Sequence, residues 1–185
     1  MLYAYFKTLV KEVVYIPLGS TLRTLAYESE LLKAASLYSL NGRVLNVSVP
    51  LNEESYNPER RQFNALILLD QVSRMKKGFD LCMGVTASDI YVPQMNFVFG
   101  IADVSRGCAV LSIFRLTFGR YEESQEIFRE RVLKEAAHEL GHLLGLSHCK
   151  NRNCLMSFSN SVLEVDMKKP ILCERCLNVL KMLSE

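Results

Sequence analysis

One segment, H-E-L-G-H-L-L-G-L-S-H at residues 138–148, constrains the fold most strongly, because it holds all three histidines of the chain. On a helix, His138 and His142 lie four residues apart on one face, so both imidazoles can reach a single metal ion. Gly145 can adopt the left-handed conformation that ends a helix, which would return His148 as a third ligand. Three neutral imidazoles with one open position predict a catalytic zinc site. The alternative is a set of histidines satisfied by ordinary hydrogen bonds near a core.

A long helix is expected to carry this segment, from about residue 125 to residue 144, with Ser124 as its N-terminal cap. The face of the first two histidines continues toward the helix start as a polar stripe of Arg131, Lys134 and Glu135, which is expected to face a cleft. The other faces are apolar and are expected to be buried. Their residues are Phe128, Val132, Leu133, Ala136, Ala137, Leu140, Leu143 and Leu144.

Four cysteines supply a second group of metal-ligand side chains, namely Cys149, Cys154, Cys173 and Cys176. Four thiolates make a closed tetrahedral zinc site of the structural kind. Lys7 and Lys11 interrupt the apolar N-terminal stretch, so no secretory signal is predicted and a reducing compartment is expected. A disulfide or redox pair, and unrelated free thiols, remain as alternatives. Cys82 and Cys108 fall inside expected strands and are interpreted as buried thiols.

The spacing of these residues resembles that of the archaemetzincins, within the metzincin clan of zinc peptidases. The family motif runs H-E-x-x-H-x-x-G-x-x-H-C, four residues, C-x-M, a spacer and C-x-x-C. This chain supplies His138, Glu139, His142, Gly145, His148, Cys149, Cys154, Met156, Cys173 and Cys176 at those places. Residues 56–64, 84–86 and 96–100 also resemble family blocks, so the resemblance covers most of the chain. It implies a zinc peptidase with Met156 as an apolar floor beneath the histidines.

Two departures from the family pattern stand out. Sixteen residues separate Met156 from Cys173, one fewer than in the family spacer, and a shortened loop with all ligands kept is the expected reason. Several metzincins place a tyrosine two residues after the methionine, whereas this chain has Phe158. Help for a developing oxyanion would therefore come from the zinc, the backbone or another side chain.

The 185 residues, nearly half of them apolar, are enough for one domain with a substantial core. Strands are expected at residues 10–16, 44–49, 81–85, 96–102 and 108–114, and helices at residues 20–40, 65–77 and 125–144 and at the C-terminus. Pro17 and Asn41-Gly42 are expected to end the first strand and the first helix. Residues 51–62 and 86–94 are expected to be loops.

This order predicts a mixed α/β fold (α+β) whose five-stranded sheet is mainly parallel. By resemblance, residues 96–102 would form an antiparallel edge strand to which a peptide adds, whereas an ordinary hairpin is the alternative. A small subdomain, residues 146–185, is expected to be fastened by the second zinc onto residues 1–145. Its final helix is expected to turn Leu177, Leu180 and Leu183 inward.

The predicted activity is zinc-dependent peptide hydrolysis with Glu139 as the general base, which takes a proton from water and delivers it to the leaving amine. The alternatives are a zinc-stabilised binding protein with weak catalysis, which Phe158 favours, and a zinc-finger interaction module formed by the cysteines. No stretch reaches the length of a membrane span, and a net charge of +2 gives no sign of nucleic-acid binding. We expect a cytoplasmic monomer that binds a peptide or protein substrate and two zinc ions.

Overall fold

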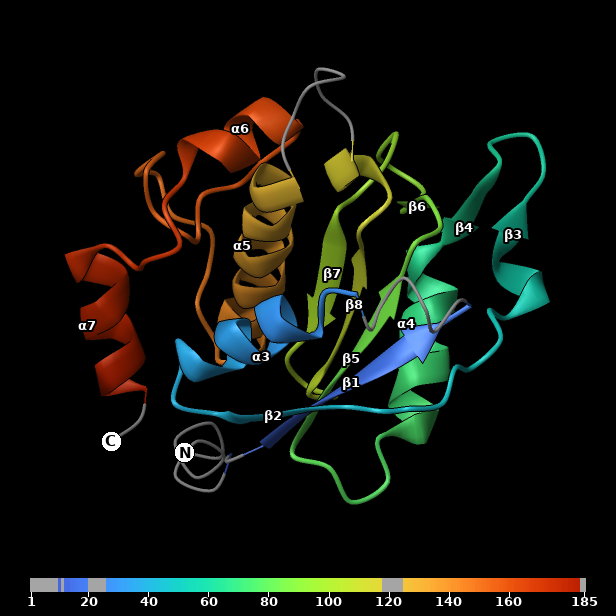
Figure 1. Ribbon diagram of the computed structural model, residues 1–185, viewed down its shortest axis with the longest axis horizontal. Helices are drawn as coiled ribbons and strands as arrows, with labels where there is room; N and C mark the ends of the chain where they lie inside the picture. Colours follow the sequence, from blue (N-terminus) through green and yellow to red (C-terminus); the bar gives the residue numbers. More distant parts are fainter. Residues whose placement is uncertain (1–9, 11, 20–25, 118–124, 184–185) are drawn as a thin grey trace.

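A central sheet of five strands organises the computed structural model, which describes residues 10, 12–19, 26–117 and 125–183. The strands lie in the order β2-β1-β5-β8-β7 (Figure 1). Their bounds are β1 Glu12–Leu18, β2 Asn41–Val44, β5 Leu81–Thr86, β7 Gly100–Asp103 and β8 Cys108–Ser112. The pairs β1–β2, β1–β5 and β5–β8 are parallel, and β7 pairs antiparallel with β8. The mixed α/β fold with a mainly parallel sheet and an antiparallel edge is therefore confirmed.

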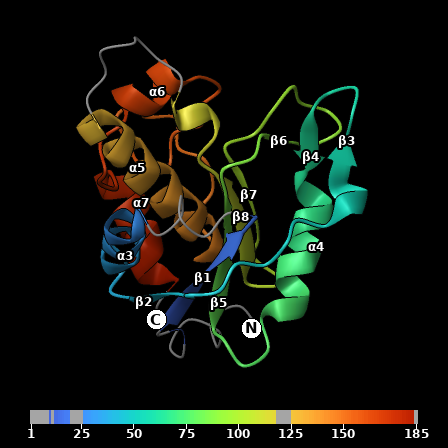
Figure 2. The same ribbon diagram turned by 45° about the vertical axis from the view of Figure 1, so that its right-hand side comes forward.

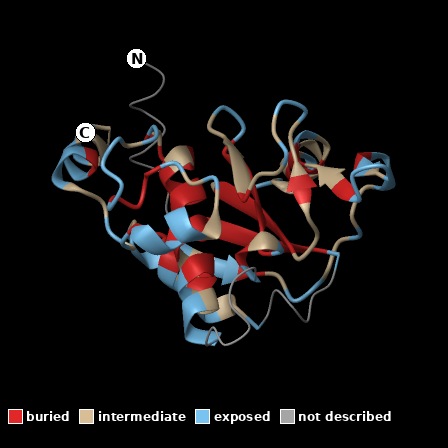
Figure 3. Cartoon of the chain, turned by 90° about the horizontal axis from the view of Figure 1, so that it is seen from above, coloured by how far each residue is buried: buried red, intermediate tan, exposed pale blue. Residues whose placement is uncertain are grey.

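Alternate residues of the central strands enter two separate cores, as the period of a strand requires. On one face, Val13, Met83 and Leu111 pack with helices α3 (Glu28–Ser36) and α5 (Gln125–Leu143). On the other face, residues such as Val14 and Val110 pack against α4 (Ala65–Met75). Figure 2 shows the sheet between these layers, and Figure 3 shows the buried residues along its strands. Burial on both faces explains the near-continuous apolar runs.

The first strand runs further than predicted. β1 continues through Pro17 to Leu18, past the end of β2, where the Pro17 carbonyl accepts a hydrogen bond from the Val49 backbone at 2.9 Å. A proline is tolerated there because no regular β2 partner needs its missing N–H. Asn41 and Gly42 begin β2 instead of ending a helix, and residues 45–49 lie outside any named strand.

Close packing accounts for the glycine at the start of β2. A Cβ atom on Gly42 would lie 2.9 Å from Leu32 Cδ2 and 3.1 Å from Ala35 Cβ, so β2 can run directly beneath α3 only with glycine there.

A second, three-stranded sheet lies within the predicted loops and at the end of the first of them. It contains β3 (Tyr56–Asn57), β4 (Gln62–Asn64) and β6 (Ile90–Tyr91). Strands of two or three residues carry too few alternations to produce a sequence pattern, which is why the prediction missed them.

Helix boundaries follow local capping. The Asn64 side chain accepts a hydrogen bond from the Leu66 backbone at 3.0 Å and so caps α4 as predicted, while α4 ends at Met75, two residues earlier than expected. α5 has the predicted bounds within one residue, but its predicted cap, Ser124, lies outside the described residues. Ser20, the residue expected to cap the helix predicted at residues 20–40, also lies outside them.

The polar stripe of α5 is buried, and the prediction that it faces a cleft is wrong for most of its length. Arg131, Lys134 and Glu135 are 1–3% exposed and are covered by the C-terminal segment. Arg131 makes two 2.7 Å contacts with the Asp166 carboxylate, on a helix that was not predicted, α6 (Val162–Met167). Of the stripe, only Glu135 also lines the cavity described below.

The final helix, α7 (Glu174–Met182), forms as predicted, but Leu177 is 41% exposed and does not turn inward. Leu180 packs against the core, and Leu183 lies close to Gly145. None of the helices in the described part of the chain is long and apolar enough to cross a membrane.

Two leucines of α4 provide a test of this layered packing. Leu68 is fully buried, whereas Leu66 is half exposed on the same helix. We expect Leu68→Ala to lower the free energy of unfolding by about 2–5 kcal/mol through the lost contacts and the cavity. Leu66→Ala should change it by less than about 0.5 kcal/mol. Denaturant unfolding followed by circular dichroism measures both, and equal losses would contradict the assigned faces.

Candidate metal centres

Three imidazoles converge at the C-terminal end of α5. His138 and His142 come from the helix, and Gly145, at φ +89°, turns the chain so that His148 comes back beside them. The Nε2 atom of His142 lies 3.1 Å from that of His138 and 3.2 Å from that of His148. Three nitrogens bound to one zinc at 2.0–2.1 Å lie roughly 3.3 Å apart in a tetrahedral site. The spacing of the predicted ligands therefore fits one zinc ion.

Backbone carbonyls fix which nitrogen of each helical imidazole faces this point. His138 Nδ1 lies 2.9 Å from the Leu155 carbonyl, and His142 Nδ1 lies 2.8 Å from the Leu146 carbonyl. Because a carbonyl only accepts, Nδ1 donates in both cases and Nε2 is left with its lone pair. Burial lowers the pKa of His138 well below its ordinary value and also lowers the pKa of His142. Both effects favour the neutral form that binds metal.

Glu139 lies beside the histidine group in a buried position. It is 4% exposed and lines the same cavity as the three histidines. Its Oε2 atom has no hydrogen-bond partner among the described residues. Burial, followed by the neighbouring carboxylate of Glu135, raises the pKa of Glu139 to about 8.

Gly100 on β7 makes room for this carboxylate. A Cβ atom built on Gly100 would lie 2.6 Å from Glu139 Oε1 and 2.7 Å from Cδ. The edge strand therefore passes directly over Glu139, and its backbone forms one wall around the side chain. No sequence signal pointed to this role, because the glycine precedes the histidine motif by 38 residues.

The four C-terminal cysteines form a second group, whose sulfur atoms all lie within 4.8 Å of one another. Cys149 Sγ lies 3.7 Å from Cys173 Sγ, and two sulfurs on one zinc at about 2.3 Å lie roughly 3.8 Å apart. The Cys173 backbone donates to Cys154 Sγ at 3.3 Å. A hydrogen bond from the Cys176 backbone is the main cause that lowers the pKa of Cys173 to about 7. A cluster of this geometry suits a closed, structural metal site.

Met156 connects the two groups. Its carbonyl accepts a 2.8 Å hydrogen bond from the backbone of Cys149, the residue next to His148. Its fully buried side chain lies against Gly141, between the two helical histidines, and 3.9 Å from the Tyr38 hydroxyl. Met156 therefore packs against the helix segment that carries the histidines, and its role as a floor beneath them stays a prediction.

A cavity of about 600 Å³ opens over the histidines. Residues 97–102 line it, as do Phe158, Ser159 and Asn160 together with His148. The lining is mostly apolar, and its charged side chains are Glu135 and Glu139. It therefore suits a mainly apolar ligand.

A polar network, which sequence reasoning missed, holds the backbone at Asn96, next to the cavity-lining residues 97–102. Arg115 makes two 2.7 Å contacts with the Asp89 carboxylate, and Gln62 donates to the same carboxylate at 3.0 Å. Arg60 and Gln62 also donate to the Asn96 carbonyl, at 2.8 and 2.9 Å. This bonding replaces a strand ladder, which explains why the predicted strand at residues 96–102 becomes regular only at Gly100.

Comparisons with known proteins agree with this arrangement. A family model described as Peptidase family M54 matches residues 1–182. The archaemetzincin of Methanopyrus kandleri is 47% identical over 131 residues, which cover 71% of this chain and 73% of that protein. The crystal structure of archaemetzincin from the same organism matches with a TM-score of 0.82 at 37% identity, over 94% of this chain and 95% of that chain. A zinc-dependent peptidase from Methanocorpusculum labreanum matches with a TM-score of 0.76 at 26% identity, over 90% of this chain and 99% of that chain.

The geometry of the two groups predicts separate metal occupancies. We expect two zinc ions per chain, with His142→Ala removing the ion of the histidine group and Cys176→Ser removing at least the ion of the cysteine group. Native mass spectrometry with elemental analysis gives the count. A count that His142→Ala leaves unchanged would show that the three histidines hold no metal.

Proposed function

This chain belongs to peptidase family M54 and is a zinc metallopeptidase, and we propose that it cleaves peptide bonds over the histidine group with Glu139 as general base and acid. The observation that carries the proposal is the convergence of three Nε2 atoms with a buried carboxylate in one cavity. We propose that His138, His142 and His148 bind a catalytic zinc and that Cys149, Cys154, Cys173 and Cys176 bind a structural zinc.

Zinc on three imidazoles supplies a Lewis acid with an open position, which polarises a carbonyl and lowers the pKa of water toward neutrality. Glu139 would accept a proton from the attacking water and return it to the leaving amine. The lack of a hydrogen-bond partner at Oε2 among the described residues supports this role, because that lone pair is available for a proton. The walls around Glu139, including Gly100, keep bulk water away and limit the carboxylate to few positions.

The edge strand offers backbone groups for a peptide. The Ser112 backbone donates to the Phe99 carbonyl at 2.7 Å, which makes residues 99, 101 and 103 the bonded positions toward β8. Gly100 and Ala102 therefore direct their N–H and C=O groups away from β8, and both line the cavity. A substrate added here as a further strand would place its backbone across the histidine group.

Phe158 supports the view that no phenol assists the reaction. Its ring is 49% exposed and lies 5.2 Å from the ring of His148, at the position where several metzincins have tyrosine. The neighbouring Ser159 lines the cavity with a buried hydroxyl that lacks a partner among the described residues. We therefore propose zinc, backbone N–H groups and Ser159 as the stabilisers of a developing oxyanion.

We further propose that one chain is sufficient for activity, in a reducing cytoplasmic setting and without nucleic acid or membrane. One chain supplies all seven expected ligands, so the two proposed zinc sites need no residue from a partner chain. None of the six cysteines forms a disulfide, which supports the reducing setting.

Replacing the expected base tests the mechanism. Glu139→Gln should keep both zinc ions and lower kcat on a peptide substrate by about 10²–10⁴-fold, because the amide cannot accept the water proton. Glu126→Gln, at an exposed position near the start of α5, is the matched control and should retain the wild-type rate. Hydrolysis that survives Glu139→Gln would contradict the assigned role.

A second variant tests the packing over Glu139. Gly100→Ala should keep the zinc content but lower kcat by roughly 10- to 100-fold, because the new Cβ forces the carboxylate aside. Gly42→Ala produces comparable crowding against Leu32, far from the cavity, and should reduce stability without changing kcat. Equal kcat values for the two variants would show that Gly100 has no special role.

A further inference from the structure

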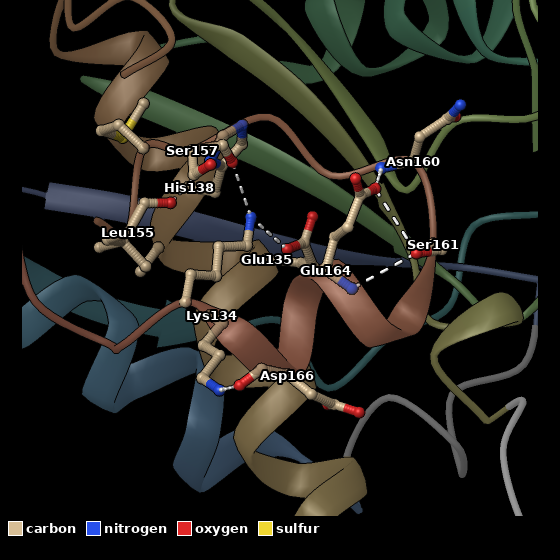
Figure 4. Close-up of polar contacts among 12 residues, drawn as sticks. Lys134, Glu135, His138, Leu155, Ser157, Asn160, Ser161, Glu164 and Asp166 are labelled. Atoms are coloured by element: carbon tan, nitrogen blue, oxygen red, sulfur yellow. Dashed lines mark hydrogen bonds and ion pairs between the residues drawn. The ribbon is translucent and has the colours of Figure 1, made fainter. Parts of the chain in front are cut away.

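A fully buried lysine lies close to the proposed catalytic residues. Lys168 follows α6 and its side chain is 0% exposed. Its ammonium group lies 2.7 Å from Glu135 Oε1 and donates to the Ser157 carbonyl at 3.2 Å. Figure 4 shows dashed lines from one ammonium group to Glu135 and to Ser157. Moving a lysine ammonium out of water costs free energy unless a partner charge compensates it, so Lys168 depends on its contact with Glu135.

The partner carboxylate, Glu135, lies close to the proposed general base. Glu135 lies on α5 one turn before Glu139, is 3% exposed, and lines the same cavity. Carboxylates four residues apart on a helix repel each other, and the repulsion grows where water is excluded. Without compensation, Glu135 would place a second negative charge beside the proposed general base.

The same ammonium group also holds the turn that follows Met156. Ser157 follows Met156, and the Leu155 carbonyl of the same turn orients His138. One ammonium group therefore connects α5 to the turn that supports the histidine group.

We propose that Lys168 is a positioning residue for peptide hydrolysis. It cancels the charge of Glu135, so that Glu139 is the uncompensated carboxylate of the cavity, and it holds the Met156 turn against α5. This inference rests on the proposed role of Glu139 as general base.

A neighbouring lysine provides the contrast. Lys134 is also buried on α5, but its carboxylate partner, Glu130, is 51% exposed and neither residue lines the cavity. Lys134 Nζ reaches the Asp166 carbonyl at 3.4 Å, on the side covered by α6. A lysine that only stabilises the fold should behave as Lys134 does.

A double-mutant cycle tests the proposal on the zinc-loaded full chain, with Lys168→Met, Glu135→Gln and the double variant. Lys168→Met should lower kcat at least about tenfold, because it leaves a buried carboxylate unpaired next to Glu139. KM should stay within about twofold, since residues 97–102 are untouched. The double variant, which leaves neither charge unpaired, should recover most of the lost kcat. Lys134→Met should lower the midpoint of thermal unfolding and leave kcat unchanged.

Several results would overturn the proposal. A double variant as slow as Lys168→Met would show that charge compensation plays no part. A loss of kcat in Lys134→Met as large as that in Lys168→Met would show that any loss of a buried lysine lowers kcat through reduced stability. If Lys168→Met does not fold, the comparison passes to Glu135→Gln, which leaves the ammonium unpaired. The double variant should then be faster than Glu135→Gln, and equal or lower kcat would count against the proposal. Failure of the proposed function would appear separately, as hydrolysis that survives Glu139→Gln.

Discussion

Burial of charge along one face of α5 is the constraint on which the rest of the structure depends. Arg131 and Glu135 lie in the interior of the protein, where an unpaired ion costs several kcal/mol. Asp166 and Lys168 provide the opposite charges, both from the segment that follows the histidine motif. The C-terminal segment is therefore held to the helix by charge pairing as well as by apolar contact. The ion pairs require particular residues to meet, whereas apolar contact alone would allow other alignments.

This docking fixes the histidine group and the cysteine group at once. The same segment brings the Leu155 carbonyl to His138 and places Met156 against the helix. Cys149 adjoins His148, and its backbone N–H donates a hydrogen bond to the Met156 carbonyl. The same backbone that brings the cysteines together therefore also holds the third imidazole in place. The histidine group and the cysteine group thus share one piece of backbone, and the order of one supports the order of the other.

The sequence was informative where chemistry repeats locally. The four-residue separation of His138 and His142 predicts that both lie on one face of a helix. Gly145 predicts a turn, and Asn64 predicts the start of a helix. The structure has each of these features. It was uninformative where a residue's role depends on a distant partner. The polar stripe of α5 is predicted to face a cleft because nothing local indicates that Asp166 and Lys168 cover it. Gly100 and Gln62 act through contacts with residues far along the chain, so their roles could not be predicted from neighbouring residues.

The position of these compensating charges late in the chain has a consequence for biosynthesis. α5 is synthesised before Asp166 and Lys168, so the counter-charges of its buried face are not yet present when the helix sequence is complete. Until they emerge, Arg131 and Glu135 are better solvated in an open helix than in a closed domain. The charge pairs that cover this face of α5 can therefore form only after the last turn of α6 and the residue after it have been added.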